Sequence, residues 1–385
     1  MNKRPLMVLL AVLILLAVGG GALYEWGNQS WQQEDQRIGQ KTLAGFVPAN
    51  VAEIALRSAQ EELHVVKSGN GWVLRERADF PADLNRIAAL LAKLADIKVV
   101  QTEALASDSE RSRLLLVEPK AAATEAGTSL ELKDAAGKPL GRLLLGKKVT
   151  KKTTQPDPQT GQPKEVEVAV GRYLVAGSDA NIAQVVSDGL EEAVAAAPLW
   201  EVKPVLQLDR VKSMTVTQAD GRPRWMLTRA TPGDVFLFGG GGSERPDPQK
   251  AQDRISAIYA ISQNDVIAKP DPVATGLDKP LTVKIDTFDN LSYTFKIGGK
   301  VGTGYAFTFT SSGEPPLTRP LVKDEKPEER QKKEKEYLDL RVKWMEQLTR
   351  ERNLEKWTYE VPKMTIEPLL VERSQLLSDK KPVRK

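Results

Sequence analysis

Residues 71–94, GWVLRERADFPADLNRIAALLAKL, contain the pattern that decides the fold class. Gly71-Trp72-Val73-Leu74 has the composition of a short β-strand, and Asp83 lies in the first turn of the helix expected after it. An acidic residue in a first turn favours the start of a helix. The apolar positions of this expected helix, residues 82–95, share one stripe: Leu84, Ile87, Leu91 and Leu94. A strand joined to a single amphipathic helix indicates an α+β module.

The order of features in Val51–Val100 returns in Val211–Ala268. Each stretch runs from an alternating strand through a tryptophan-containing strand and an Asp/Pro segment to a helix. The sequence therefore predicts two tandem related modules of mainly antiparallel sheet with helices, residues 48–205 and 206–370. Trp72 and Trp225 take matched places in this alignment, which favours core anchors over ligand-stacking residues.

Five further segments complete the predicted organisation. Residues 178–197 are expected to form a helix that ends before Pro198. Two Gly- and Pro-rich stretches, 151–164 and 238–248, are expected to be loops. The charge-dense stretch 323–356 is expected to be a long helix of the second module, and residues 371–385 a polar tail. The apolar stripe of the expected helix 323–356 is predicted to cover the second sheet, and it consists of Tyr337, Leu340, Trp344 and Leu348.

Residues 5–24, PLMVLLAVLILLAVGGGALY, carry no charge. As a helix rising about 1.5 Å per residue they span about 30 Å, the thickness of the hydrocarbon core of a bilayer. The basic flank in residues 1–4 places the N-terminus in the cytoplasm. We predict a single-pass bacterial inner-membrane protein with residues 25–47 as a linker and a periplasmic C-terminal domain. A signal peptide cleaved near Ala22 is the alternative.

The composition excludes several classes of chemistry. The chain has 385 residues, no cysteine, one histidine and a net charge of +4. Disulfide frameworks, cysteine nucleophiles, zinc ribbons and multi-histidine metal sites need residues that are missing here. A charge so close to neutral does not indicate a nucleic-acid-binding surface. We therefore predict no metal, no cofactor and no nucleic-acid partner.

The chemistry-bearing residues that remain have no motif around them. His64 lies in an expected strand, which favours a structural or surface role over a general base. Gly239–Gly242 lacks the Lys-Ser/Thr ending of a phosphate loop, and Gly298–Gly304 reads as a hairpin turn. The other candidates are interpreted as solvated surface: Glu61, Glu62, Glu191, Glu192, Asp157–Gly161, Lys147, Lys148, Lys151 and Lys152. No catalytic, cofactor-binding or metal-binding residue is assigned.

Gly71–Leu74, followed by Phe80-Pro81-Ala82-Asp83 and the run Ile87–Leu94, resembles domain-of-unknown-function family 4340. The resemblance covers most of residues 48–300, and the long charged helix 323–356 departs from it. It implies a bacterial, membrane-anchored protein, often encoded beside gliding-type ABC transporter permeases and their auxiliary subunits. It implies no catalytic residue.

The anchor, the repeated module and the missing catalytic motif together predict a non-enzymatic function. We expect a periplasmic accessory or scaffold protein that binds envelope partners, with subunits of an ABC-type transporter or gliding-like complex as candidates. One alternative is a periplasmic module that binds a small molecule, glycan or peptide in a cleft between the two repeats. A hydrolase built on Asp and Glu is a third reading.

Overall fold

The computed structural model describes residues 36–69, 71–120, 125–157, 160–177, 180–320 and 325–378, which form two compact units. The first unit comprises the described residues up to His64 together with Asn85–Ala195. The second comprises Val65–Leu84 and the chain from Ala196 onward. The predicted span 5–24 and the end of the tail, residues 379–385, lie outside the described residues. Within those described, no helix has the length and apolar character needed to cross a membrane.

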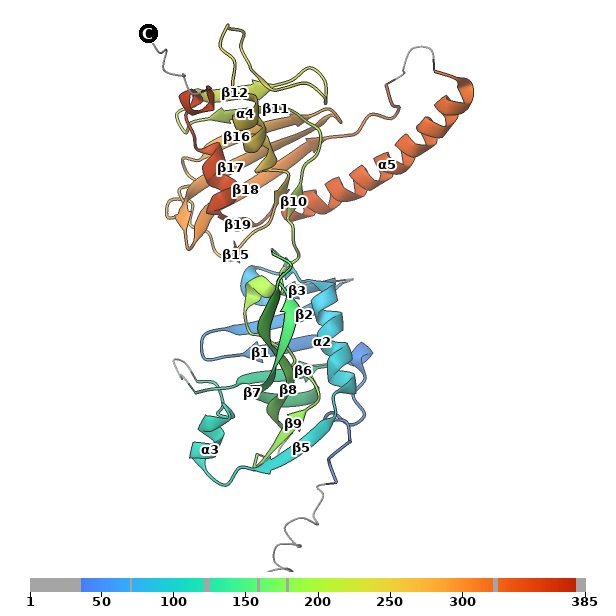
Figure 1. The fold of residues 1–385 in the computed structure, drawn as a ribbon, viewed down its shortest axis with the longest axis vertical. Coiled ribbons are helices and arrows are strands. Elements are labelled where there is room, and N and C mark those ends of the chain that lie inside the picture. The colour runs from blue at the N-terminus through green and yellow to red at the C-terminus, as the bar shows by residue number, and fades with distance from the viewer. Residues whose placement is uncertain are drawn as a thin grey trace, which may run out of the picture. The chain divides into compact units, whose positions relative to one another are not determined.

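The first large sheet has its strands in the order β4-β3-β2-β1-β6-β7-β8-β9-β5. Strands β6, β7, β8 and β9 pair antiparallel with their neighbours. The bounds of these elements are β1 Glu53–Arg57, β2 Glu62–Ser68, β3 Gly71–Leu74, β4 Phe80–Pro81, α2 Leu84–Asp96, β5 Val99–Ala104, α3 Asp108–Arg113, β6 Thr128–Lys133, β7 Pro139–Pro156, β8 Pro163–Ala176 and β9 Ile182–Val186. The predicted helix 82–95 is thus confirmed as α2, which runs beside the sheet (Figure 1). Its predicted apolar stripe is wrong for Leu84, which lies at the start of the helix and is 56% exposed.

The second large sheet has the order β13-β12-β11-β16-β17-β18-β19-β15, and β10 pairs with β14 separately. Its elements are β10 Leu206–Gln207, β11 Val211–Thr217, β12 Pro223–Thr228, β13 Leu237–Phe238, α4 Pro248–Ser256, β14 Ala260–Ile261, β15 Asp265–Ile267, β16 Leu281–Thr287, β17 Leu291–Val301, β18 Gly304–Gly313, α5 Pro327–Leu354, β19 Thr358–Pro362 and α6 Lys363–Ile366. Short 3-10 helices cover Pro48–Asn50, Arg75–Arg77, Ala197–Leu199, Glu367–Leu369 and Arg373–Leu376. Antiparallel sheets with few helices confirm the α+β class.

Local sequence explains the caps and turns that position these elements. Asp247 caps α4, because its Oδ1 accepts hydrogen bonds from the backbone N–H groups of Gln249 and Lys250. Gly221 and Asn290 have positive φ in the turns between β11 and β12 and between β16 and β17. The loop predicted for 238–248 begins within β13 and ends at α4.

The helix predicted for residues 178–197 is wrong. The described part contains β9, which lies between β8 and β5, and Ala183, Val185 and Val186 are all buried. A strand buried on both faces has a nearly continuous apolar sequence, which periodicity alone does not separate from a helix. Leu190 then has φ +48°, so a helix does not continue through it.

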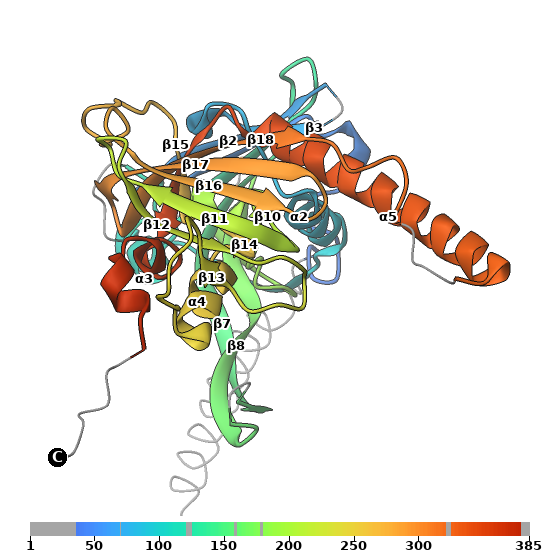
Figure 2. The same cartoon turned by 90° about the horizontal axis from the view of Figure 1, so that it is seen from above.

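The loop predicted for residues 151–164 is also wrong over most of its length. β7 and β8 pair from Leu143 with Ala176 out to Pro156 with Pro163, and the hairpin they form extends past the rest of the sheet (Figure 2). β-Branched residues in both arms, including Thr153 and Val166, favour strands. The turn chemistry is confined to the tip, where Gly161 has φ +69°.

Residues 65–84 contribute to the core of the second unit, although they interrupt the first unit in sequence. Phe80 is fully buried, and its ring meets Trp357 edge-to-face with centroids 5.0 Å apart. Trp357 Nε1 donates a hydrogen bond to the carbonyl oxygen of Ala78 at 2.9 Å. The segment is therefore held by both apolar and polar contacts of its own unit.

Candidate functional site

His64, the only histidine of the chain, lies on β2 with a side chain that is 31% exposed. It lines a hollow of about 290 Å³ together with charged residues of β1, β6 and β7. Its Nε2 is 3.8 Å from Glu62 Oε1, and Glu62 also accepts a hydrogen bond from Arg57 at 2.5 Å. That bond raises the pKa of Arg57. Positive and negative side chains both line the hollow and pair with one another, so it has the character of an ion-paired surface.

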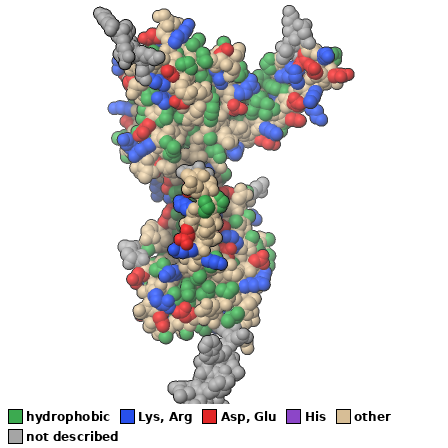
Figure 3. Space-filling model, viewed as in Figure 1, with side chains coloured by type: hydrophobic (Ala, Val, Ile, Leu, Met, Phe, Trp, Pro, Cys, Tyr) green, Lys and Arg blue, Asp and Glu red, His purple; other side chains and the backbone are tan. Residues whose placement is uncertain are grey.

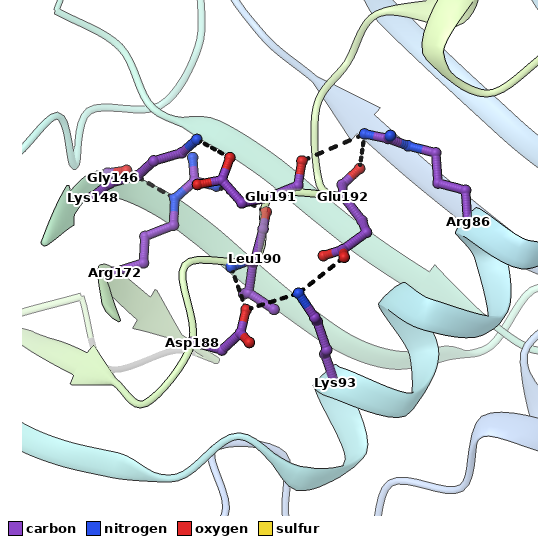
Figure 4. A network of polar contacts seen from close by, with 9 residues as sticks. All are labelled: Arg86, Lys93, Gly146, Lys148, Arg172, Asp188, Leu190, Glu191 and Glu192. Atoms are coloured by element: carbon purple, nitrogen blue, oxygen red, sulfur yellow. Dashed lines mark hydrogen bonds and ion pairs between the residues drawn. The ribbon is translucent and has the colours of Figure 1, made fainter. Parts of the chain in front are cut away.

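The segment Asp188–Glu192 is held by four cationic side chains of the first unit (Figure 4). Lys93 of α2 contacts Glu192 Oε1 at 2.9 Å and Asp188 Oδ1 at 3.4 Å. Arg86, about two turns earlier on the same side of α2, donates to the carbonyl oxygen of Glu192 at 2.8 Å. Lys148 of β7 pairs with the Glu191 carboxylate. Glu191 and Glu192 thus form ion pairs, and the prediction of plain solvated surface is wrong for Glu192, whose side chain is 18% exposed.

Arg172 of β8 is the buried member of this network. Its Nε donates to the carbonyl oxygen of Gly146 at 2.9 Å, and Nη1 donates to that of Leu190 at 3.4 Å. Burial lowers the pKa of Arg172 to about 10, opposed by the charge of Glu191. Because its hydrogen bonds go to backbone carbonyls, the guanidinium ties the backbone of the segment, at Leu190, to that of β7, at Gly146. We interpret the network as a structural clamp on residues 188–192.

The other predicted candidates belong to different loops and turns. Gly239–Gly242 lies in the loop before α4, and Gly298–Gly304 spans the β17–β18 turn, as predicted. Asp157 and Gly161 lie at the tip of the β7–β8 hairpin. Among the described residues, no three His, Asp or Glu side chains are grouped to hold a metal ion.

The two tryptophans differ in role. Trp225 of β12 is 2% exposed, and its Nε1 donates to the carbonyl oxygen of Val371 at 2.8 Å, so the prediction of a core anchor is confirmed for it. Trp72 of β3 is only partly buried. β12 is the direct neighbour of β11, whereas β3 is separated from β1 by β2. The matched placement of the two residues is therefore wrong.

A buried acid pair in the second unit had no motif to predict it. Glu201 is 3% exposed and accepts hydrogen bonds from Gln263 Nε2 and the Val266 backbone N–H, each at 3.0 Å. The carboxylate of Asp265 accepts two hydrogen bonds from the Arg77 guanidinium: Nε donates to Oδ1 at 2.5 Å, and Nη2 donates to Oδ2 at 3.0 Å. Burial, with a hydrogen bond to Asp265, raises the pKa of Glu201 to about 8. The pair therefore holds one proton and one negative charge at neutral pH.

Helix α5 is anchored to the second sheet at its C-terminal end. Leu348 and Leu354 are buried, and Glu351 is fully buried. Glu351 Oε2 accepts a hydrogen bond from Tyr293 Oη of β17 at 3.0 Å, and its Oε1 accepts one from the Gln207 backbone N–H at 3.2 Å. Burial raises the pKa of Glu351. A carboxyl group buried in this way fixes the register of the helix on the sheet.

The rest of α5 extends away from the sheet (Figure 1). The predicted stripe is wrong for Leu340, which is 42% exposed, and Tyr337 donates a hydrogen bond to the carbonyl oxygen of Pro316 at 2.8 Å. Leu338 and Val342 are 48% and 56% exposed on another face. Figure 3 shows charged side chains of both signs along this helix with hydrophobic ones between them. α5 therefore presents apolar side chains for which the described part of the second unit provides no cover.

Comparison with known proteins identifies a family and no individual relative. No curated protein and no solved structure gives a significant match to the chain. The family described as domain of unknown function (DUF4340) matches residues 72–280, more than half of the chain. The match includes β3, β4 and α2, which carry the residues of the predicted resemblance. The chain belongs to this DUF4340 family.

Proposed function

We propose that the protein is a non-enzymatic accessory or scaffold protein, anchored in the bacterial inner membrane by residues 5–24, with its folded part in the periplasm. Its partner is another envelope protein, and subunits of an ABC-type transporter or gliding-like complex are the first candidates. The uncharged N-terminal stretch supports the location. The resemblance of the sequence to a family often encoded beside such transporters supports the choice of partner.

The observation that carries this proposal is the exposed apolar face of α5. Leu338, Val342 and Met345 are spaced four and three residues apart, so they share one side of the helix. Leu338 and Val342 are about half exposed although they belong to an ordered helix whose far end is buried. Such a face fits the apolar face of a partner helix, and the flanking charges give the contact specificity.

We further propose that the two units are copies of one module. Along the first sheet the order β1-β6-β7-β8-β9-β5 parallels β11-β16-β17-β18-β19-β15 in the second. In each unit a helix precedes, along the chain, the strand that stands last in this sheet order: α2 precedes β5, and α4 precedes β15. A scaffold built from two such modules offers related surfaces to an assembly.

The experiment compares purification of the full-length chain from inner membranes with that of the double variant Leu338→Glu/Val342→Glu. The native chain is expected to remain in alkali-extracted membranes and to co-purify a defined envelope protein. Two carboxylates in the apolar contact should weaken that association at least tenfold, because burying an unpaired charge costs more than about 1.4 kcal/mol.

The matched control is Val235→Glu/Val273→Glu, which adds the same charges at two residues outside α5 that are 60% and 73% exposed. It is expected to retain the partner. Equal recovery of the partner with the α5 variant and with the native chain would contradict the proposed role of this face. Turnover of a hydrolase substrate by the purified chain, lost on substitution of a single carboxylate, would contradict the non-enzymatic assignment.

A further inference from the structure

A pocket of about 510 Å³ lies in the first unit, where residues 37–44 pass over the beginnings of β5 and β7 and the end of β8. Its volume is in the range of small-molecule sites. Its lining includes Arg37, Lys41, Thr42, Arg142 and Gln184. Nothing in the sequence marked it, since these residues form no motif.

The wall of the pocket is fixed by backbone pairing. The Gly39 N–H donates to the Val99 carbonyl oxygen at 2.8 Å, and the Val99 N–H donates to the Gln40 carbonyl oxygen at 3.0 Å. The Thr42 N–H donates to the Ile97 carbonyl oxygen at 3.1 Å. Residues 39–42 therefore pair along the beginning of β5, and the pocket is part of the folded unit.

The charged residues that line the pocket are all cationic: Arg37, Lys41 and Arg142. Lys41 pairs with Asp96 at 3.1 Å and Arg142 with Glu118 at 2.8 Å, outside the lining. The side chains of both pairs are more than half exposed, and ion pairs of this kind contribute about 0–1 kcal/mol. Lys41 and Arg142 can therefore turn to a ligand at little cost. Two guanidinium groups and an ammonium group favour a phosphate over a single carboxylate.

Two polar atoms of the pocket residues are buried without a hydrogen-bond partner. Gln184 of β9 is 8% exposed, and its Oε1 receives no hydrogen bond from the described residues. The Oγ1 of Thr42 is likewise buried without a partner. A buried amide oxygen that accepts no hydrogen bond lowers the stability of the fold by about 1–3 kcal/mol. The carbonyl-type oxygen of an amide only accepts hydrogen bonds, so a ligand that carries a hydroxyl or ammonium group is the kind that would satisfy it.

We propose that this pocket binds an organic phosphate that carries a hydroxyl or ammonium donor. The phosphate lies among Arg37, Lys41 and Arg142, and the donor reaches Gln184 Oε1. Two sources offer this chemistry. Arg37 follows Tyr24, the end of the predicted span, by thirteen residues, which brings a phospholipid headgroup within reach. A soluble phosphate ester such as glycerol 3-phosphate is the other source.

The test uses the full-length chain in a neutral detergent and measures binding by calorimetry. The probes are glycerol 3-phosphate, dihexanoyl phosphatidylglycerol below its micellar concentration, and glycerol as the uncharged control. Saturable binding of glycerol 3-phosphate supports a soluble ligand. Binding of the short-chain lipid alone supports a headgroup. Glycerol should not bind in either case.

Gln184→Leu keeps the size of the side chain and removes the acceptor, and it is expected to weaken binding at least tenfold. Arg37→Gln removes one rim charge and should weaken binding to a similar extent, with a smaller salt dependence. The controls are Gln101→Leu, an exposed site on β5, and Arg245→Gln, an exposed site in the second unit. Failure of both phosphates to bind, or equal binding by Gln184→Leu and Gln101→Leu, would overturn the proposal. The pocket residues belong to the first unit and α5 to the second, and the variants of the two experiments share no residue, so this result is independent of the partner experiment.

Discussion

Replacing Phe80 with alanine is expected to lower the free energy of unfolding of the second unit by about 3–5 kcal/mol. The ring is fully buried between Trp357 and Tyr359, with centroids 5.0 Å and 6.0 Å away. Truncation leaves a cavity and removes two edge-to-face contacts, which add to the lost burial of apolar area. Urea unfolding followed by tryptophan fluorescence measures the change, because Trp357 lies against the substituted site.

Leu84→Ala is the control, since Leu84 is 56% exposed only four residues further along the chain. Its free energy of unfolding should change by less than about 0.5 kcal/mol. A Phe80→Ala protein as stable as the Leu84→Ala protein would show that residues 65–84 do not belong to the core of the second unit.

Glu201→Gln is expected to remove a pH dependence from the stability of the second unit. The pKa of Glu201 is about 8 in the folded chain, against an ordinary value of 4.5. Between these values the unfolded chain loses the proton that the folded chain keeps. The unfolding free energy of the native protein therefore falls as the pH rises from 4.5 to 8, by up to about 1.4 kcal/mol per pH unit for one proton. Glutamine mimics the protonated acid and does not titrate.

Asp265 contributes to the unfolding free energy in a different pH range. Hydrogen bonds from Arg77 lower the pKa of Asp265 despite its burial, so its contribution is lost only as the pH falls below about 3.8. Glu351 and Asp289 have raised pKa values and add slopes of the same sign as that of Glu201. The informative quantity is thus the difference between Glu201→Gln and the native chain across pH 5–8, measured by urea unfolding.

Glu314→Gln, at an exposed glutamate of the same unit, is the matched control and should keep the native profile. A Glu201→Gln curve parallel to the native curve from pH 5 to 8 would contradict a protonated Glu201 in the folded chain.

Elements whose signals are local were predictable from the sequence. The spacing of Ile87, Leu91 and Leu94 is sufficient to predict the buried face of α2. The turn at Asn290 is predictable from the tolerance of asparagine for positive φ. β9 was mistaken for a helix because it is buried on both faces. The hairpin of β7 and β8 was mistaken for a loop because the Gly and Pro residues of its tip outweighed the β-branched arms. In each case the local sequence was compatible with two kinds of secondary structure, and tertiary packing determined which of them forms.

Contacts between distant parts of the chain left little trace in the sequence. Arg77 and Asp265 are 188 positions apart, and neither belongs to a pattern. Glu201 carried a weak signal, because an acidic residue stands inside the apolar run Leu199–Val202. The pocket around Gln184 could not be predicted, because it depends on the pairing of residues 39–42 with the beginning of β5.

The most direct test of the scaffold proposal is site-specific photo-crosslinking in intact cells. A photoreactive amino acid replaces Val342 of α5 in one strain and Val273 in another, since both side chains are exposed. The proposal predicts an adduct at position 342 with one envelope protein, identified by mass spectrometry, and none with that protein at position 273. The same adduct from both positions, or no adduct from position 342, would contradict it.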